Sequence, residues 1–307
     1  MNSSIITHSI YTISIPHPTP NTQPILSPYS LLNPDPESSF EIEGLSRFPP
    51  MDSGRLLLFS LSLALVSRAF SDSLIRITPD RRSSTKLSRD DVLFCDSWRF
   101  TVETNDAGVW VSVPDRCVQW VKDYMTGDRY RSDSEFAADD SLSFAKTVQI
   151  AGDGKDVWVF DIDETLLSNL PYYAAHGFGS EAFDDSTFDE WVNLAEAPAL
   201  QASLRLYREV EQLGFKIVLI TGRIEPQRNV TEKNLVYAGY SNWERLFLRG
   251  RADSGKTALV YKSEKRRELE DEGYRIHGSS GDQWSDLLGF AIARRSFKLP
   301  NPMYYIP

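Results

Sequence analysis

The chain has 307 residues, of which 41% are hydrophobic, 25% charged and 12% aromatic. This composition is typical of a globular protein and excludes collagen-like, coiled-coil and wholly disordered chains. The formal net charge of −10 disfavours a phosphate-backbone ligand, so we expect no nucleic-acid partner. The longest apolar-rich stretch covers only residues 56–66, too few to cross a bilayer, so we do not expect a protein integral to the membrane.

The first 69 residues differ in composition from the rest of the chain. Residues 1–50 hold 9 of the 17 prolines and a single basic residue, and we expect them to form a disordered leader. Residues 51–69 combine a weakly basic start, an apolar stretch and small residues before Ala69, the pattern of a secretory signal peptide. We therefore expect Met51 to be the true start. An organelle transit peptide is the alternative, which several acidic residues and scarce arginine disfavour.

The remaining residues, 70–307, keep a net charge of −8 and are long enough for one large domain with a small insert. The signal peptide predicts entry into the secretory pathway, and the extracellular space, the cell wall and the vacuole all remain open as destinations. Asn229-Val-Thr231 is a glycosylation sequon, which is meaningful on that route. The sequence leaves open whether the protein is a monomer or a homodimer.

The two cysteines, Cys95 and Cys117, both lie in this part of the chain. Between them, the runs 98–102 and 109–113 flank an Asn-Asp-Ala-Gly turn signal, a pattern that predicts an N-terminal hairpin closed by a disulfide. Such a bridge would stabilise the fold by roughly 3 kcal/mol. Two buried free thiols are the alternative.

The rest of the chain alternates between helical and strand patterns. Apolar runs predict strands and amphipathic stretches predict helices. The expected strands are 157–160, 217–220, 243–248 and 274–277, and the expected helices start at Pro114 and cover 132–148, 200–213 and 225–238. This alternation predicts an α/β fold, a doubly wound parallel sheet flanked by helices. Ligands of such sheets bind beyond the carboxyl ends of the strands.

An acidic motif follows the first expected strand. Asp161-Ile-Asp163 begins where the strand ends, so both carboxylates can face one pocket. Such a pair can hold a divalent cation while one carboxylate attacks phosphorus and the other protonates the departing alkoxide. A helix N-cap is an equally common role for an acidic pair after a strand.

Further polar motifs follow the other strands. Thr221-Gly222 comes after the second apolar strand, where a hydroxyl and free backbone N–H groups can bind phosphate oxygens. Asp282 and Asp286 follow the last expected strand and share one face if a helix begins there. Asp282 could be a metal ligand, and Asp286 a ligand or an orienting residue behind one. Simple helix capping is the alternative for both motifs.

One lysine between these motifs could neutralise a bound phosphoryl group. Lys262 is our first choice and Lys256 the second, although most of the charged run at 261–267 is expected to be solvated helix surface.

The order of these motifs, DIDET, ITGR, a lysine and GDQWSD, resembles that of the haloacid dehalogenase-like (HAD) phosphatases. The similarity is closest to the plant acid phosphatase and vegetative storage protein family (class B-like acid phosphatases), over roughly residues 90–307. It rests on TGRIEPQRNVTEKNLVYAGY at 221–240, YKSEKRRELEDEGY at 261–274, GDQWSDLLG at 281–289 and FKLPNPMYYIP at 297–307.

The resemblance implies an acid phosphatase that hydrolyses small phosphomonoesters with Mg²⁺. Asp161 would form an aspartyl-phosphate, and Asp163 would act as general acid and then as general base. The implied metal ligands are Asp161, the backbone carbonyl of Asp163, and Asp282, with Asp286 in support. Thr221, Gly222 and Lys262 would bind the phosphoryl oxygens. An acidic pH optimum is also expected.

The resemblance also implies a small cap at about 167–199, inserted after the first catalytic strand. Its aromatic residues could select the leaving group, but core packing is the stronger expectation. Some members of the family are nitrogen stores, so a vegetative storage glycoprotein with weak or no activity is the alternative function. Another HAD reaction is disfavoured because Asp163 has no role in dehalogenation and the chain is too short for an ion pump.

Overall fold

The computed structural model describes residues 87–108 and 110–306, which belong to one compact unit spanning residues 80–307. The expected leader at 1–50 and the expected signal peptide at 51–69 lie outside the described residues. Among the helices that are described, none combines the length and apolar character needed to cross a lipid bilayer.

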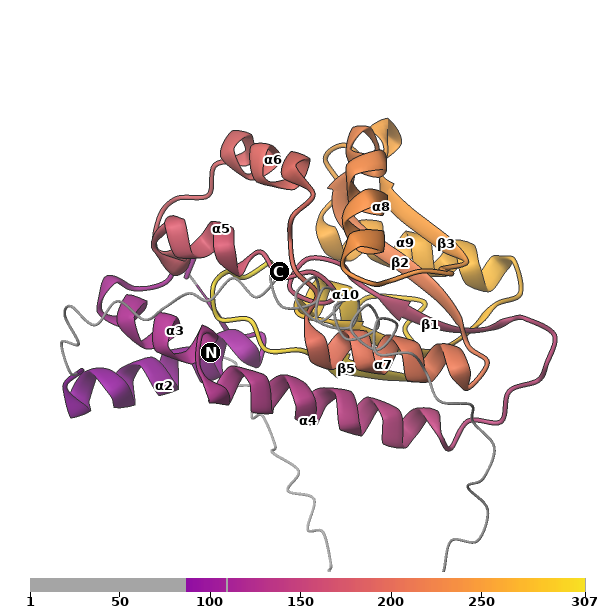
Figure 1. Cartoon of the computed structure of the whole chain (residues 1–307), viewed down its shortest axis with the longest axis horizontal. Coiled ribbons are helices and arrows are strands. Elements are labelled where there is room, and N and C mark those ends of the chain that lie inside the picture. Colours follow the sequence, from indigo (N-terminus) through magenta and orange to yellow (C-terminus); the bar gives the residue numbers. More distant parts are fainter. Residues whose placement is uncertain (1–86, 109, 307) are drawn as a thin grey trace, which may run out of the picture. The chain divides into compact units, whose positions relative to one another are not determined.

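The centre of the unit is a sheet of five parallel strands (Figure 1). In spatial order the strands are β3 (Arg245–Arg249), β2 (Lys216–Ile224), β1 (Asp156–Phe160), β4 (Arg275–Gly281) and β5 (Arg295–Lys298). The four strands expected from sequence are confirmed, although β2 and β4 run several residues further than their apolar cores. The fifth strand, β5, was not expected, because it is short and lies at the edge of the sheet.

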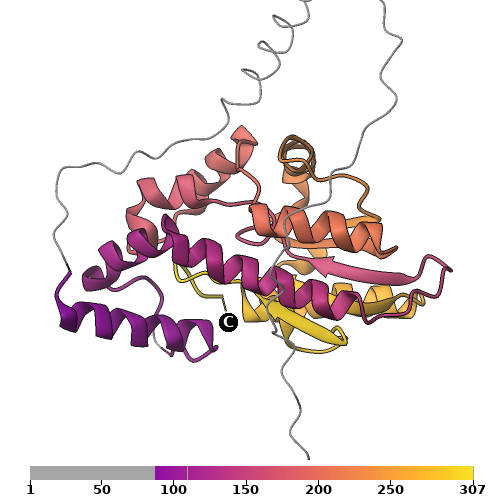
Figure 2. The ribbon, with the colours of Figure 1, turned by 60° about the horizontal axis from the view of Figure 1, so that its bottom comes forward.

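Helices cover both faces of the sheet, which confirms the expected architecture. On one face α4 (Asp128–Ala145) and α7 (Gln201–Gln212) lie side by side (Figure 2), while α9 (Ala258–Asp271) packs on the other. Successive side chains of β1 point to opposite faces of the sheet and so pack against both layers of helices. Trp158 and Phe160 join the cluster with α4 and α7, whereas Val157 and Val159 join the cluster with α9.

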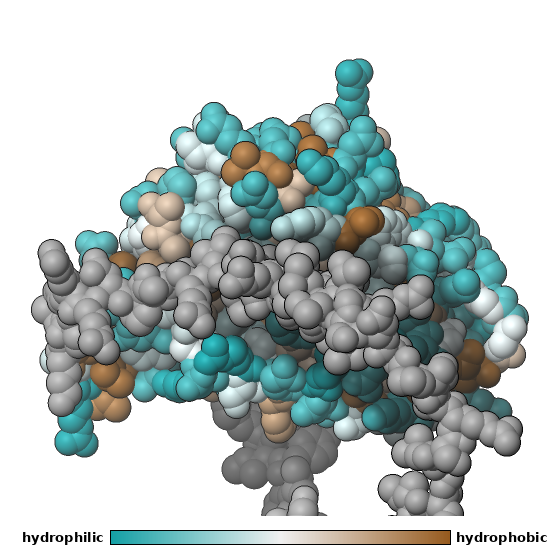
Figure 3. Space-filling view, in the orientation of Figure 1, coloured by the Kyte–Doolittle hydropathy of each residue, from teal (hydrophilic) through white to brown (hydrophobic). Residues whose placement is uncertain are grey.

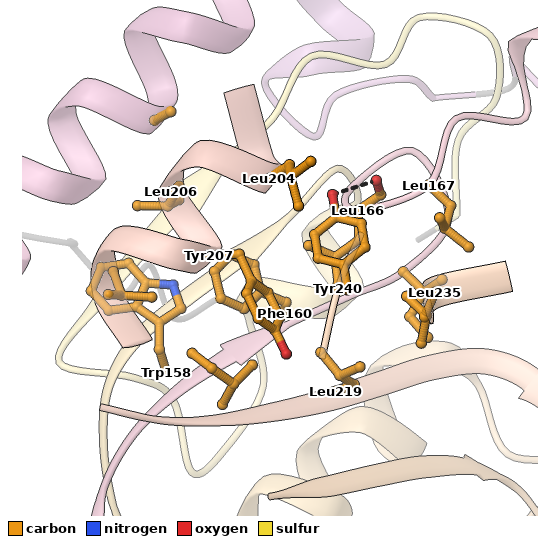
Figure 4. Packing of buried hydrophobic residues seen from close by; sticks show 14 of the residues in the cluster. Trp158, Phe160, Leu166, Leu167, Leu204, Leu206, Tyr207, Leu219, Leu235 and Tyr240 are labelled. Atoms are coloured by element: carbon orange, nitrogen blue, oxygen red, sulfur yellow. Dashed lines mark hydrogen bonds between the residues drawn. The ribbon is translucent and has the colours of Figure 1, made fainter. Parts of the chain in front are cut away.

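The larger of these clusters contains many aromatic side chains. Figure 4 shows Trp158, Phe160 and Tyr207 packed together beside leucines from the loop after β1 and from α7. The hydroxyl of Tyr240 in this cluster donates to the carbonyl oxygen of Leu166 over 2.8 Å. The hydrogen bond fixes the loop that leaves β1, because a buried hydroxyl without a partner would destabilise the fold.

The other helices either precede β1 or connect the strands. They are α3 (Val118–Met125) after the short helix η1 (Asp115–Cys117), α8 (Arg228–Tyr237) after η3 (Glu225–Gln227), η4 (Arg251–Asp253) and α10 (Trp284–Leu287). The helices expected from Pro114 and over 200–213 and 225–238 are confirmed. The helix expected at 132–148 is α4, but it begins at Asp128 after Gly127, so Ser132 is not its cap.

The expected N-terminal hairpin is wrong. Residues 98–102 belong to a helix, α2 (Arg89–Glu103), which starts at the Ser88 cap, whose side chain accepts a hydrogen bond from the backbone N–H of Asp91. The expected disulfide is confirmed. Cys95 on α2 and Cys117 on η1 are joined, with their Cα atoms 5.5 Å apart.

The segment between β1 and α7 contains α5 (Leu170–Ala175), η2 (Gly177–Gly179) and α6 (Asp185–Leu194), within the stretch expected to form a cap. Tyr172, Tyr173 and Phe178 from this segment are buried in a second cluster together with both cysteines and Met303. The N-terminal helices that the disulfide joins therefore pack against this segment.

On the face shown in Figure 3, the described surface is mostly hydrophilic with scattered apolar residues.

Candidate active site

The polar motifs meet at the carboxyl ends of β1 and β4, which are neighbours in the centre of the sheet. Asp161 follows β1 directly, and its backbone N–H donates to the carbonyl oxygen of Ser280 on β4 over 3.0 Å. Asp282 follows β4. The strand order reverses direction at this pair, since the chain adds β2 and β3 on one side of β1 and β4 and β5 on the other. Such a switch point leaves a crevice for ligands.

Three carboxylates gather there. Asp161, Asp282 and Asp286 each offer an oxygen, and these oxygens lie within 4.8 Å of one another. All three residues are at most 6% exposed. The burial matters because three adjacent anions without water are costly unless a cation neutralises them. Burial and the neighbouring Asp286 accordingly raise the pKa of Asp161 well above its usual range.

Lys262 supplies part of that neutralisation. Its Nζ comes from α9, lies 2.6 Å from Asp161 Oδ1 and also contacts Asp286 Oδ1. Burial would lower the pKa of this lysine, but the two carboxylates outweigh it and raise the pKa. Lys256, the second choice, lies elsewhere and donates to Asp253 over 2.9 Å. The structure thus brings Lys262, and not Lys256, to the carboxylates.

The carboxylate cluster fits a divalent cation. One lysine cannot balance three buried carboxylates, and hard carboxylate oxygens are the ligands that Mg²⁺ prefers. Asp282 is oriented by Gln283 and Asn301, whose amides donate to its Oδ2 over 2.7 and 2.8 Å. Asp286 accepts from the backbone N–H of Gln283 over 2.9 Å. Both aspartates are therefore held in place without a metal.

Asp163 points away from this cluster and binds Arg223. The guanidinium donates to both carboxylate oxygens, with Nη2 2.7 Å from Oδ1 and Nε 3.1 Å from Oδ2, and Asn169 Nδ2 donates to Oδ1 over 2.9 Å. Burial would raise the pKa of Asp163, but the charge of Arg223, the hydrogen bonds from Arg223 and Asn169, and the charge of Lys262 together outweigh it and lower the pKa. Asp163 is thus an ion-paired carboxylate in the free protein.

Thr221 and Gly222 form the edge of the site beside Asp163. The Thr221 side chain is buried, its Oγ1 is 3.5 Å from Asp163 Oδ2, and it accepts from the backbone N–H of Arg223 over 3.1 Å. Gly222 is exposed, with open space where a Cβ would stand. The backbone of Gly222, near the end of β2, is therefore accessible to a ligand.

Sequence reasoning missed several residues of this site. Arg223 belongs to the TGR motif but had no role assigned. Glu164 is 1% exposed and accepts from the hydroxyl of Tyr304 over 2.7 Å, and burial together with Asp282 and Asp163 raises its pKa to about 8. Asn301 and Tyr304 belong to the C-terminal segment 299–306, which shows no chemical motif. The available signal was the FKLPNPMYYIP block at 297–307, which contributes to the family resemblance but gave these two residues no role.

A cavity of about 640 Å³ opens beside Asp163. Gly222 and Arg223 form one side of it, the segment containing α5 and α6 forms another, and residues 303–306 close it. The aromatic residues expected in the cap therefore have two roles. Tyr172 and Tyr173 are part of the second hydrophobic cluster and also line the cavity.

The sequon lies on α8. Asn229 is exposed, while Thr231 is fully buried and its hydroxyl accepts a hydrogen bond from Arg223 NH1 over 3.2 Å. The threonine thus has a structural role of its own, because it orients the guanidinium that holds Asp163.

Comparisons with known proteins agree with this geometry. The family model described as HAD superfamily, subfamily IIIB (acid phosphatase) matches residues 80–307. Acid phosphatase 1 of Solanum lycopersicum is 55% identical over 70% of this chain and 85% of its own length. Vegetative storage protein 2 of Arabidopsis thaliana is 39% identical over 69% of this chain and 80% of its own.

Among solved structures, the class C acid phosphatase from Bacillus anthracis is similar, with a TM-score of 0.53 and 26% identity over 62% of this chain and 86% of that one. The chain therefore belongs to the acid phosphatase family, subfamily IIIB of the HAD superfamily, and is a phosphoric monoester hydrolase.

Proposed function

We propose that the protein hydrolyses phosphate monoesters through an aspartyl-phosphate on Asp161, with Mg²⁺ as cofactor. The observation that carries the proposal is the buried cluster of Asp161, Asp282 and Asp286 with Lys262, next to Asp163 at the mouth of a cavity. A nucleophile, its charge-balancing groups and a second carboxylate thus converge where a phosphoryl group could be bound.

Asp161, Asp282 and the backbone carbonyl of Asp163 would hold the cation, with Asp286 beside them. When bound, Mg²⁺ supplies positive charge that stabilises the phosphoryl oxygens as negative charge develops on them. The chain contributes the fixed ligands. Asp282 in particular keeps its orientation through Gln283 and Asn301, as outer hydrogen bonds to metal ligands commonly do.

In the first step an oxygen of Asp161 forms a bond to phosphorus, and the bond from phosphorus to the ester oxygen breaks. Asp163 gives its proton to the departing oxygen. In the second step Asp163 takes a proton from water, which attacks phosphorus and releases phosphate and free Asp161. Lys262, the Thr221 hydroxyl and the Gly222 backbone N–H would hold the equatorial oxygens.

Asp163 must gain a proton before it can act as the acid. In the free protein Arg223 holds it ionised. The arriving phosphoryl group brings negative charge next to Asp163, which raises the pKa of a carboxyl group, and it offers Arg223 a second anion to bind. Both effects favour protonation of Asp163 in the complex, consistent with the acidic pH optimum expected from the family.

A vegetative storage role remains the second candidate function, because relatives carry that name, such as vegetative storage protein 2 of Arabidopsis thaliana. All side chains that the proposed chemistry requires are present, so a storage role would exist alongside phosphatase activity and would not replace it.

We also propose a secretory or vacuolar route and glycosylation at the exposed Asn229. Abundance in vegetative tissue and mass analysis of the protein purified from that tissue test these points.

The test of the reaction is turnover of a generic aryl phosphate at pH 5, with and without Mg²⁺, by the wild-type protein and by Asp161→Asn. We expect turnover that requires both the metal and Asp161. Asp253→Asn is the matched control, because this aspartate is equally buried but lies on the loop after β3. A folded wild-type protein that binds Mg²⁺ without turnover, or a rate that rises towards pH 9, would contradict the proposal.

A further inference from the structure

The wall of the cavity beside Asp163 is aromatic on the side away from the carboxylate cluster. The rings that line it are Tyr172, Tyr173, His176, Phe183, Phe188, Tyr304 and Tyr305. Packing holds several of them in place. The rings of Tyr173 and Tyr304 stack at 5.3 Å, and those of Tyr172 and His176 at 4.1 Å. A flat leaving group would therefore find a rigid apolar surface within reach of Asp163.

The charges on the same wall are of one sign. Besides Asp163, three carboxylates line the cavity, Glu181, Asp185 and Asp189. The described lining contains no lysine, and its single arginine, Arg223, is already bound to Asp163. His176 also lines the cavity, and its Nδ1 donates to the carbonyl oxygen of Tyr172 over 2.8 Å.

We propose that this wall selects the leaving group by charge, so that the preferred substrates are phosphate monoesters of aromatic alcohols with a neutral or positively charged tail. Aromatic faces and carboxylates both attract cations. A second phosphate or a carboxylate on the leaving group would instead meet three like charges without a free cation to balance it. The proposal rests on the phosphatase function proposed above and adds the class of leaving group.

The selection acts on one end of the substrate only. Lys262 and the cation that the clustered aspartates would hold attract the phosphoryl group, and neither Lys262 nor those aspartates belong to the lining that carries the acidic wall. A monoester has its negative charge at a single end, so both regions are satisfied by one orientation. A substrate with anionic groups at both ends cannot avoid repulsion in either orientation. Bisphosphates and phosphorylated aromatic acids should therefore be poor substrates.

Three para-substituted phenyl phosphates test the proposal, with an aminoethyl, an ethyl and a carboxyethyl group. The ring and the phenol are nearly alike in all three, so only the charge of the tail differs. We expect kcat/KM at pH 7 to fall from the first to the third, with about a tenfold ratio between the cationic and the anionic substrate. The difference should shrink as salt is added, because the wall is partly exposed to solvent.

The double variant Glu181→Gln with Asp185→Asn should bring this ratio close to one. The matched control is Glu190→Gln with Glu196→Gln, which removes two exposed charges from α6 and the turn after it but not from the cavity lining. It should keep the wild-type ratio. Equal kcat/KM for the three substrates, or an unchanged ratio in the first variant, would overturn the proposal. No turnover of any of the three substrates would instead contradict the phosphatase function.

Discussion

The Cys95–Cys117 disulfide offers a prediction whose size can be worked out from the structure. The bridge links positions 22 residues apart, and closing a loop of that length removes chain entropy from the unfolded state worth about 3 kcal/mol at 25 °C. Both cysteines are fully buried, and they lie in the cluster that supports Tyr172 and Tyr173. Replacing both by alanine should lower the free energy of unfolding by at least that amount, since it also leaves small cavities.

Urea unfolding at equilibrium measures this difference, provided that fluorescence and circular dichroism give coincident transitions. Wild-type protein with its disulfide reduced is the control, because it loses the bridge but keeps both sulfur atoms. We expect the reduced protein and the double alanine variant to be destabilised by similar amounts. A loss below about 1 kcal/mol in both would refute the entropy argument, and would mean that the packing of α2 on η1 is sufficient without the bridge.

Three other perturbations probe the site and the sheet. Gly281→Ala should cut turnover by about a hundredfold or more, because its Cβ would collide with Asp286 and displace a side chain beside the nucleophile. Asn301→Leu should weaken Mg²⁺ binding about tenfold in calorimetric titration, since Asp282 loses an orienting amide. An affinity equal to that of the wild type would exclude this role. The hydrogen bond from Arg275 on β4 lowers the pKa of Asp156, and this effect outweighs that of burial. Its contribution of about 2 kcal/mol is therefore present above pH 4 and lost on acidification, so unfolding of Asp156→Asn should depend less on pH between 6 and 3.

The sequence predicted the centre of the molecule better than its margins. The strand before Asp161 could be identified because a buried parallel strand must be continuously apolar, and all five residues of β1 are indeed buried. Once the strand ends are known, parallel topology brings Asp161 and Asp282 together. Lys262 was preferred to Lys256 as the lysine of the site, and the structure brings Lys262 to the carboxylates while Lys256 pairs with Asp253.

The errors have physical reasons of two kinds. The hairpin was predicted because 98–102 contains residues of high β-propensity, although Cys95, Trp98 and Val102 are spaced as on a helix and are the buried residues of α2. The contact between Arg223 and Asp163 joins residues 60 positions apart in the chain. A local sequence pattern does not indicate which side chain a charged group contacts at such a separation. The contact of Arg223 with Asp163 could therefore not be predicted from the TGR motif.

The hydrogen bonds of the C-terminal segment have a consequence for how the protein is made. Tyr304 reaches back 140 positions to Glu164, and Asn301 holds Asp282. A ribosome that has just translated the Asp161 motif must still synthesise nearly half of the chain before these contacts can form. We therefore expect the nascent polypeptide to reach full turnover only after its final stretch has emerged. A product that terminates before Asn301 would lack one of the two amides that orient Asp282, even if its sheet had formed.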